Sequence, residues 1–312
     1  MPVASGWWIL LAEVLVSRIN RLKAQTKPLI ADGGMGTLLA EQAVACGLPE
    51  AMTPDAILLE APELVAEIHV EYVSSGADIV LTCTFASSPE QLAKQNLADR
   101  LDEIHRTAAR AARSAAGEDR FVFGDLGPCG SFFPPMGTLD ERTAVASYAR
   151  RAGALVETGL IDGLLIETQF DLQEVTYAIR GVRSITDLPV AVTMSFDSHG
   201  RTMMGVGPAD LAQLAISEDV DYVGANCGRS LEETLEAIRI IQGTAPGIAL
   251  WAKPNAGLPT LLAGQTRYDL SPEAFGQWAS RFVDAGVSVF GGCCGTTPDH
   301  IRAAAERIRR RA

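Results

Sequence analysis

Short apolar and β-branched runs alternate with longer stretches of helical periodicity from Pro28 to the end of the chain. Because parallel strands need a crossover that carries the chain back across the sheet, this alternation predicts parallel pairing. The runs are continuously apolar rather than alternating in polarity, as expected for strands covered on both faces. Eight strands are expected, at residues 29–32, 78–84, 121–126, 163–167, 190–195, 222–226, 248–253 and 288–290.

Eight strand–helix units predict a closed (β/α)8 TIM barrel. The competing fold is an open doubly wound sheet, which carries G-x-G-x-x-G after its first strand. Residues 32–37 read Asp-Gly-Gly-Met-Gly-Thr instead, which lacks that spacing. We therefore expect one α/β barrel domain over residues 28–312, preceded by a helical extension over residues 1–27.

The charge balance excludes some classes of partner. The chain has 26 Lys and Arg against 38 Asp and Glu, a net charge of −12, and such a surface repels nucleic acid and anionic lipid. The apolar run at residues 7–16 is too short to cross a membrane, and its basic residues follow rather than precede it, unlike a signal peptide. With only six cysteines, the expected location is the cytoplasm.

Three cysteines follow strands whose carboxyl ends meet at one face of the expected barrel, where such enzymes place their chemistry. Cys227 follows the sixth strand, and Cys293 and Cys294 follow the eighth between glycines that permit a sharp turn. Three thiolates select zinc, and three protein ligands leave a fourth position for substrate. The pattern predicts one catalytic zinc ion per chain.

Other interpretations of the cysteines remain open. A disulfide between Cys293 and Cys294 would be strained and is disfavoured in a reducing compartment. A lone cysteine is usually a small apolar core residue, which is what we expect of Cys46. Packing is also favoured over a role as extra pocket thiols for Cys83 and Cys129.

Residues 224–228 (Gly-Ala-Asn-Cys-Gly) and 291–301 (Gly-Gly-Cys-Cys-Gly-Thr-Thr-Pro-Asp-His-Ile) resemble the zinc motifs of the homocysteine S-methyltransferase family. The resemblance extends over about residues 28–310, and the motif at 253–259 (Lys-Pro-Asn-Ala-Gly-Leu-Pro) is similar to the homocysteine-binding module of cobalamin-dependent methionine synthase. It implies a barrel, zinc held by three cysteines, and methylation of a thiol, with homocysteine the leading acceptor. Coordination to zinc lowers a thiol's pKa and presents the sulfur as the nucleophilic thiolate.

A homocysteine-like substrate also carries an ammonium and a carboxylate. Asp32 and Glu167, at two strand ends, suit the ammonium, and the backbone amides around Gly33 and Gly34 suit the carboxylate. The resemblance assigns matching positions these roles. A helix cap at Asp32 and a purely structural carboxylate at Glu167 are the alternatives.

Two asparagines complete the predicted site. Asn226 precedes Cys227 and is counted among the substrate-binding residues. Asn255 follows the seventh strand, between the two cysteine-bearing strands, and is a candidate to fill the vacant zinc position through its amide oxygen. A simple turn residue is the alternative for Asn255.

The methyl donor is expected to be a methyl-corrinoid on a separate protein, because the motifs resemble the methionine synthase branch. The alternatives are a small donor such as betaine, S-methylmethionine or S-adenosylmethionine, or a non-enzymatic zinc and thiol redox sensor that uses Cys83 and Cys129. Two departures bear on the acceptor. Residues 81–85 read Leu-Thr-Cys-Thr-Phe where the methionine synthase modules typically have Glu-Thr-Asn-Thr-Phe, and Cys129 stands where those modules have a residue other than cysteine.

Overall fold

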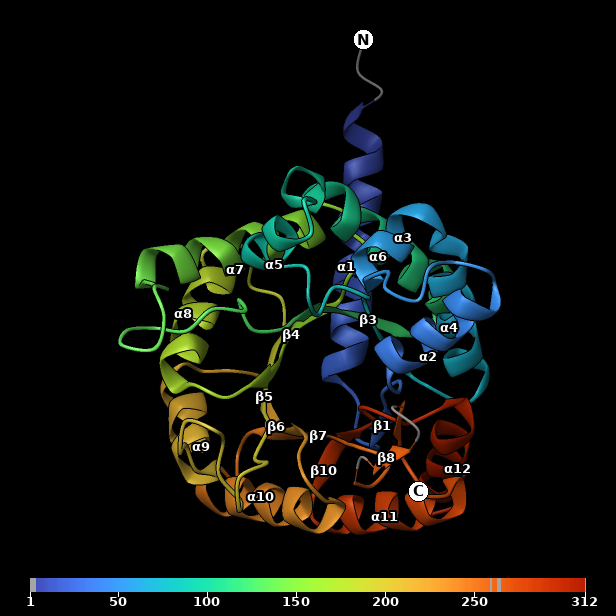
Figure 1. The fold of residues 1–312 in the computed structure, drawn as a ribbon, viewed down its shortest axis with the longest axis vertical. Helices are drawn as coiled ribbons and strands as arrows, with labels where there is room; N and C mark the ends of the chain where they lie inside the picture. Colours follow the sequence, from blue (N-terminus) through green and yellow to red (C-terminus); the bar gives the residue numbers. More distant parts are fainter. Residues whose placement is uncertain (1–3, 259, 263–264, 312) are drawn as a thin grey trace.

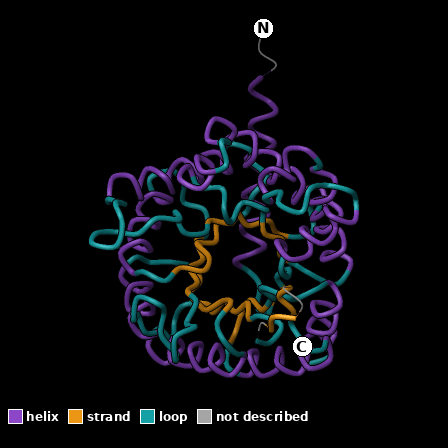
Figure 2. Tube along the Cα trace, viewed as in Figure 1, coloured by secondary structure: helices purple, strands orange, loops and turns teal. Residues whose placement is uncertain are grey.

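A ring of eight parallel strands lies inside a ring of helices in the computed structural model, which describes residues 4–258, 260–262 and 265–311 (Figure 1). The strand order is β1-β10-β7-β6-β5-β4-β3-β2, and a parallel bridge between Ala31 and Ile79 joins the two ends of the sheet. The expected barrel is confirmed, and Figure 2 shows the strands encircling its axis. The barrel strands are β1 (Leu29–Ile30), β2 (Ile79–Leu81), β3 (Phe121–Leu126), β4 (Gly163–Gln169), β5 (Val190–Met194), β6 (Tyr222–Cys227), β7 (Ala249–Pro254) and β10 (Val287–Phe290).

All eight expected strands are present, with bounds that differ by a few residues. The sequence pattern did not predict the antiparallel hairpin of β8 (Thr260–Leu262) and β9 (Gln265–Arg267), which is inserted after β7. Each of its strands has three residues, too few for a periodic pattern to be detected.

Helices cover the outside of the ring, as the crossovers require (Figure 2). The segment between β1 and β2 holds three helices rather than one, and the segment between β2 and β3 holds a short helix, a 3-10 turn and a long helix. The helices are α1 (Ala4–Lys23), α2 (Met35–Ala45), α3 (Pro54–Glu60), α4 (Pro62–Ser74), α5 (Pro89–Lys94), η1 (Ala98–Arg100), α6 (Leu101–Ala116), α7 (Glu141–Val156), α8 (Leu172–Arg183), α9 (Pro208–Ser217), α10 (Leu231–Thr244), α11 (Pro272–Asp284) and α12 (Pro298–Arg309).

The barrel interior changes from apolar to polar along the strands. Phe123, Leu165, Ala191 and Trp251 belong to a buried cluster distinct from the one beneath the outer helices. Side chains two residues further along a strand point to the same face. These next inward positions are polar and buried, and they are Asp125 on β3, Glu167 on β4, Thr193 on β5 and Lys253 on β7.

Helix α1 closes the other end of the barrel. Its Leu22 joins the interior apolar cluster, and its Arg18 donates from Nε to the buried Asp162 at 2.6 Å, next to the start of β4. Figure 1 shows the first turns of α1 projecting beyond the ring of helices. Among the described residues, no helix combines the length and apolar character needed to span a bilayer.

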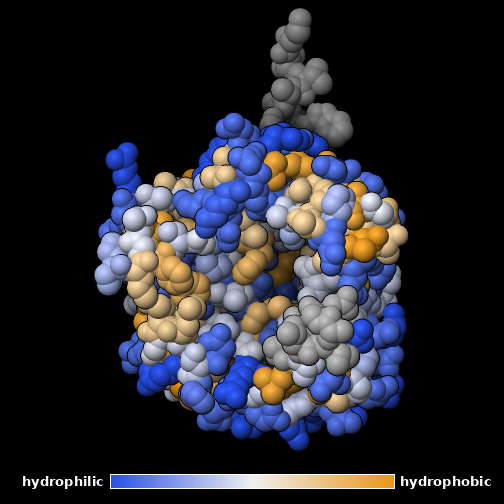
Figure 3. Space-filling view, in the orientation of Figure 1, coloured by the Kyte–Doolittle hydropathy of each residue, from blue (hydrophilic) through white to orange (hydrophobic). Residues whose placement is uncertain are grey.

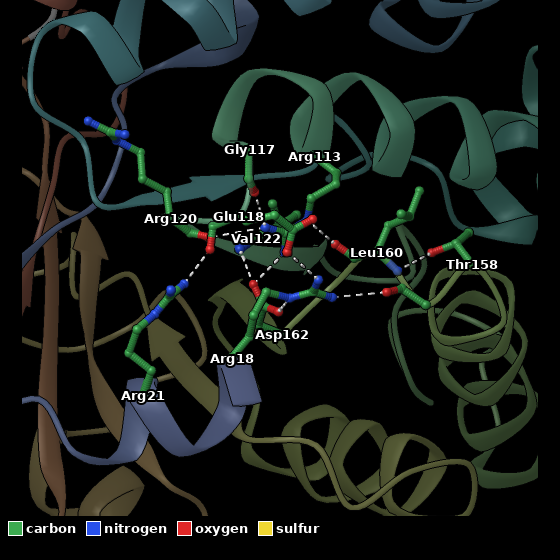
Figure 4. A network of polar contacts seen from close by, with 11 residues as sticks. Arg18, Arg21, Arg113, Gly117, Glu118, Arg120, Val122, Thr158, Leu160 and Asp162 are labelled. Atoms are coloured by element: carbon green, nitrogen blue, oxygen red, sulfur yellow. Dashed lines mark hydrogen bonds and ion pairs between the residues drawn. The ribbon is translucent and has the colours of Figure 1, made fainter. Parts of the chain in front are cut away.

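Asp162 is the centre of the polar network that attaches α1 (Figure 4). It has no exposed side-chain surface and accepts from Arg18, from Arg113 at 2.5 Å and from the Val122 backbone amide at 2.8 Å. Two guanidinium groups and an amide thus compensate one buried carboxylate, and α1 supplies one of the two cations.

We expect Arg18→Ala to lower the free energy of unfolding by roughly 1–3 kcal/mol, because Asp162 loses a charge-assisted hydrogen bond but keeps Arg113. Urea denaturation measures the change. The control is Lys23→Ala, at an exposed position of the same helix, which should stay within about 0.5 kcal/mol of the parent protein. Equal losses in both variants would show that the network does not hold α1.

Candidate metal and substrate site

The structure brings the three predicted cysteines together at the carboxyl ends of β6 and β10. Cys227 is the last residue of β6, and Cys293 and Cys294 lie just after β10. Their sulfur atoms all lie within 4.8 Å of one another, and the Sγ atoms of Cys227 and Cys293 are 2.7 Å apart. All three are free thiols, and Asn226 and Cys227 pair with Lys253 and Pro254 of β7, the strand that separates β6 from β10.

The backbone adopts unusual conformations at Cys227 and next to the other two cysteines. Cys227 has φ 53° and Gly228 φ 78°, so the chain turns sharply in the left-handed region where β6 ends. Gly295 has φ 76°, and a Cβ there would overlap the ring of Tyr268. The non-glycine residue Cys227 adopts a conformation that costs free energy, as is common at functional sites.

A cavity of about 500 Å³ opens beside the cysteines. Figure 3 shows the hollow at the centre of this face, with apolar side chains inside it. Its lining combines the three thiols with the first turn of α2 and with the inward polar residues of the strands. The lining residues are Asp32, Gly33, Gly34, Met35, Gly36, Thr37, Pro54, Asp55, Leu81, Thr82, Cys83, Phe85, Ala86, Asp125, Glu167, Thr168, Cys227, Lys253, Gly292, Cys293 and Cys294.

Lys253 links the two predicted carboxylates. Its Nζ lies 3.1 Å from Asp32 Oδ1 and 3.5 Å from Glu167 Oε1, and all three side chains are buried. Asp32 also accepts from the Leu81 backbone amide at 2.8 Å. The sequence analysis did not assign Lys253 to the site, although its position two residues after the inward-facing Trp251 was a usable signal.

Burial and charge set the protonation states of this group. Burial raises the pKa of Asp32 and of Glu167, and the Lys253 ammonium only partly offsets that rise. Burial lowers the pKa of Lys253, but Asp32 and Glu167 together hold it above its ordinary value. The lysine is therefore a fixed positive charge, and the carboxyls are the groups that titrate.

Asn226 lies beneath the cavity rather than in its lining. It is fully buried and accepts from the Thr168 amide at 3.0 Å and the Thr193 hydroxyl at 2.8 Å. Its Nδ2 donates to Thr168 Oγ1 at 2.6 Å and lies 3.8 Å from Cys293 Sγ. Asn226 thus connects β4, β5 and a cysteine, and its predicted contact with substrate stays a prediction.

Asn255 lies just beyond β7, and its Nδ2 donates to the Gly228 carbonyl at 3.0 Å. Its Oδ1 is buried and has no hydrogen-bond partner among the described residues. The side chain therefore braces the turn that follows Cys227 and retains a free acceptor. Its predicted role as a zinc ligand stays a prediction.

The glycines lie where helix α2 begins at the cavity. Gly34 is its N-cap, and no side chain caps this end of the helix. The Gly34 amide donates to Thr296 Oγ1 at 2.9 Å, and a Cβ on Gly34 would come within 2.6 Å of the Cys293 carbonyl oxygen. The amides of the first turn of α2 lack partners within their own helix, as at any helix N-terminus, so this turn rather than Gly34 itself suits an anion.

Cys83 and Cys129 pack in the hydrophobic core as expected, and Cys46 does not. Cys83 is buried but lines the cavity, whereas Cys129 packs fully buried outside the lining, with its backbone amide donating to Glu174 at 2.6 Å. The prediction of a core position for Cys46 is wrong, because this residue is exposed at the C-cap of α2. A position just past the end of a surface helix loses the neighbours that would bury it.

The family model for homocysteine S-methyltransferase matches residues 29–308. The chain belongs to the homocysteine S-methyltransferase family. Methionine synthases of Mycobacterium leprae and Mycobacterium tuberculosis are each 32% identical over 301 and 298 residues, which is 90% of this chain. The chain spans only 24% of the length of these two relatives.

Among solved structures, the metallated form of the homocysteine methyltransferase MmuM from Escherichia coli shares the fold. The TM-score is 0.76 with 24% sequence identity, over 93% of this chain and 99% of that one. Our chain therefore has the same barrel fold as the Escherichia coli enzyme over 93% of its length.

The contribution of the two buried ion pairs to stability can be tested by replacing Lys253. Lys253→Met leaves Asp32 and Glu167 without their cation, which should lower the free energy of unfolding by about 3–5 kcal/mol at neutral pH. Because both carboxyls have raised pKa values in the folded state, the loss should be small near pH 4 and grow towards pH 8 as they ionise.

Urea denaturation at several pH values measures this dependence. Lys27→Met, at an exposed lysine, is the matched control and should change the free energy by no more than about 0.5 kcal/mol at every pH. A loss in Lys253→Met that does not vary with pH would show that the two carboxyls do not depend on this ammonium.

Proposed function

We propose that this chain is a zinc-dependent thiol S-methyltransferase, with homocysteine as the acceptor. The single observation that carries the proposal is the group of three free thiols in the lining of a cavity that also holds buried carboxyls and one ammonium. Membership of the homocysteine S-methyltransferase family supports it. The buried position of Cys129, outside the cavity, disfavours the redox-sensor alternative.

The residues present fit a zinc ion. Thiolates around tetrahedral zinc lie about 3.8 Å apart, given a zinc–sulfur distance of about 2.3 Å, and the sulfurs of Cys227, Cys293 and Cys294 already lie within 4.8 Å of one another. Without metal, hydrogen bonds from the other two thiols lower the pKa of Cys294 to about 3. When bound, zinc would lower the pKa of the substrate thiol, so that its sulfur is available as a thiolate.

The chain's own residues would orient the amino-acid part of the substrate. Glu167 lines the cavity, and its Oε1 faces Lys253 at 3.5 Å but has no hydrogen-bond partner among the described residues, which leaves it able to accept from an ammonium group. Asp32 adds negative charge beside it, and Lys253 keeps both carboxyls in place. The N-terminal amides of α2, next to Gly33 and Gly34, suit the carboxylate. Fixing both ends leaves the sulfur as the free reacting group.

Zinc content tests the metal site. Protein purified under reducing conditions should contain about one zinc per chain, and Ala at position 227, 293 or 294 should remove most of it, because two thiolates hold zinc far more weakly than three. Elemental analysis measures the metal, and circular dichroism should show an unchanged fold. The control is Cys46→Ala, at an exposed cysteine outside the site, which should keep full zinc. Full zinc in all three site variants would refute the assignment.

We propose that the methyl donor is a methyl-corrinoid carried by a separate protein. The motif at residues 253–259 supports this through its resemblance to the methionine synthase branch, and so does the similarity to two methionine synthases. The loop after β3 exposes Phe132 and Met136, with 37% and 58% of their surface accessible. Phe85 at the cavity is 39% exposed. Apolar surface beside an active-site opening is typical of a docking region.

The donor can be identified directly. Zinc-loaded protein and homocysteine are incubated separately with methylcobalamin, betaine, S-methylmethionine and S-adenosylmethionine, and methionine is measured. We expect turnover with methylcobalamin, in which the thiol loses its proton, the carbon–sulfur bond forms as the cobalt–carbon bond breaks, and cob(I)alamin leaves with the electron pair of that bond. Phe132→Ser should reduce that turnover without changing zinc content. Turnover with a small donor alone would refute the corrinoid route but not thiol methylation.

The cellular location is part of the proposal. All six cysteines are free, as is usual for proteins of the reducing cytoplasm. A site that depends on three free thiols would be oxidised more readily elsewhere, and this supports the expected cytoplasmic location.

A further inference from the structure

The cavity contains a carboxyl that the proposed function does not use. Asp125 lies on β3 two residues after Phe123, which places its side chain on the inward face of the barrel, and it lines the cavity. Only 5% of its surface is exposed. Its backbone is fixed, since its amide donates to Thr82 Oγ1 at 2.9 Å and its carbonyl accepts from Thr84 Oγ1 at 2.7 Å.

The carboxyl of Asp125 lacks the partners that the other acids of the cavity have. Its Oδ1 is buried with no hydrogen-bond partner among the described residues. Asp32 and Glu167 share the Lys253 ammonium, and no ion pair joins Asp125 to a described cation. Asp55, also in the lining, accepts from Ser87 and from Gln95. A buried carboxyl without a donor is costly unless a ligand supplies one.

A second carboxyl with room for a hydrogen-bond donor lies on the neighbouring strand. Glu167 is on β4, which pairs with β3, and its Oε1 has an ion pair with Lys253 at 3.5 Å but no hydrogen-bond partner within the described chain. Burial, followed by the charge of Glu167, raises the pKa of Asp125 well above its ordinary value, and the Lys253 ammonium only partly offsets that rise, so these two carboxyls repel each other until a ligand brings a further cation. A primary ammonium has three donors and one positive charge, which suits two such acceptors at once.

We propose that Asp125 is a third substrate-binding carboxyl, which together with Glu167 binds the α-ammonium group of the thiol substrate. This inference rests on the proposed function and makes it more specific. It predicts that the site selects amino-acid thiols against the same thiols without the amino group, and that Asp125 contributes to this discrimination.

The test compares the binding of L-homocysteine and 4-mercaptobutyrate, its counterpart without the amino group, to zinc-loaded protein by calorimetry. In Asp125→Asn the dissociation constant for L-homocysteine should rise by roughly 10- to 100-fold, the scale of a charge-assisted hydrogen bond. The constant for 4-mercaptobutyrate should change less than about twofold. Glu167→Gln should show the same pattern, and the double variant should lose less than the product of the single losses, because both groups bind one ammonium.

Asp197→Asn is the matched control, since it removes one negative charge from an exposed position after β5 and should change neither constant more than about twofold. Asp125→Ser repeats the comparison with a smaller side chain. Equal weakening of both thiols, or no change, in the two Asp125 variants would overturn the proposal.

The methyl-transfer panel separates this inference from the proposed function. Binding that discriminates through Asp125, but without methyl transfer from any donor, would refute the function and leave the recognition role standing. Methyl transfer with unchanged discrimination in Asp125→Asn would refute the recognition role alone. A parent protein that binds neither thiol would refute both.

Discussion

The Lys253 ammonium is the interaction on which the site depends. It is the one basic side chain among the described residues that line the cavity, against the acids Asp32, Asp55, Asp125 and Glu167. Without it, the two buried carboxyls of Asp32 and Glu167 would have no compensating charge, at a cost of several kcal/mol. With it, the interior keeps a net negative character that can accept a cationic group of a ligand.

The alternation of side chains along each strand explains why charged residues form one layer at the cavity. Apolar side chains such as Phe123 and Trp251 fill the middle of the barrel, and the residues two positions further on are Asp125 and Lys253. The apolar layer carries the stability of the closed barrel, so the layer above it is free to hold charged groups that destabilise the fold unless they pair. The N-terminal helix closes the opposite end through Leu22 and Arg18.

The part of the cavity that holds the cysteines depends on backbone conformation and hydrogen bonds rather than on ion pairs. Cys227 and Thr168 both adopt left-handed backbone conformations, and the side chain of Asn226 contacts the Thr168 side chain and amide directly. Buried hydrogen bonds of this kind hold two strained positions that loops alone would not maintain. Asn226 also lies 3.8 Å from Cys293 Sγ, and a site whose backbone is held in place in this way binds its ligands at a lower cost.

The sequence by itself determined the barrel, the three cysteines as one group, and the placement of Asp32 and Glu167 in the cavity. Each follows from local signals: apolar runs at regular intervals, and functional residues directly after them, whose strand ends must meet at one face. Motif resemblance added the family. The short β8–β9 hairpin and the exposure of Cys46 were missed, because three-residue strands and a helix end carry little periodic signal.

Only the tertiary structure decided which polar groups find partners. Lys253 pairs with Asp32, 221 positions away in the sequence, while Asp125 faces the same cavity without a partner among the described residues. Asn226 lies under the site, and the Gly34 amide is already bonded to Thr296. A hydrogen bond depends on tenths of an ångström between strands that are far apart in the chain, and residue type and spacing do not contain that information.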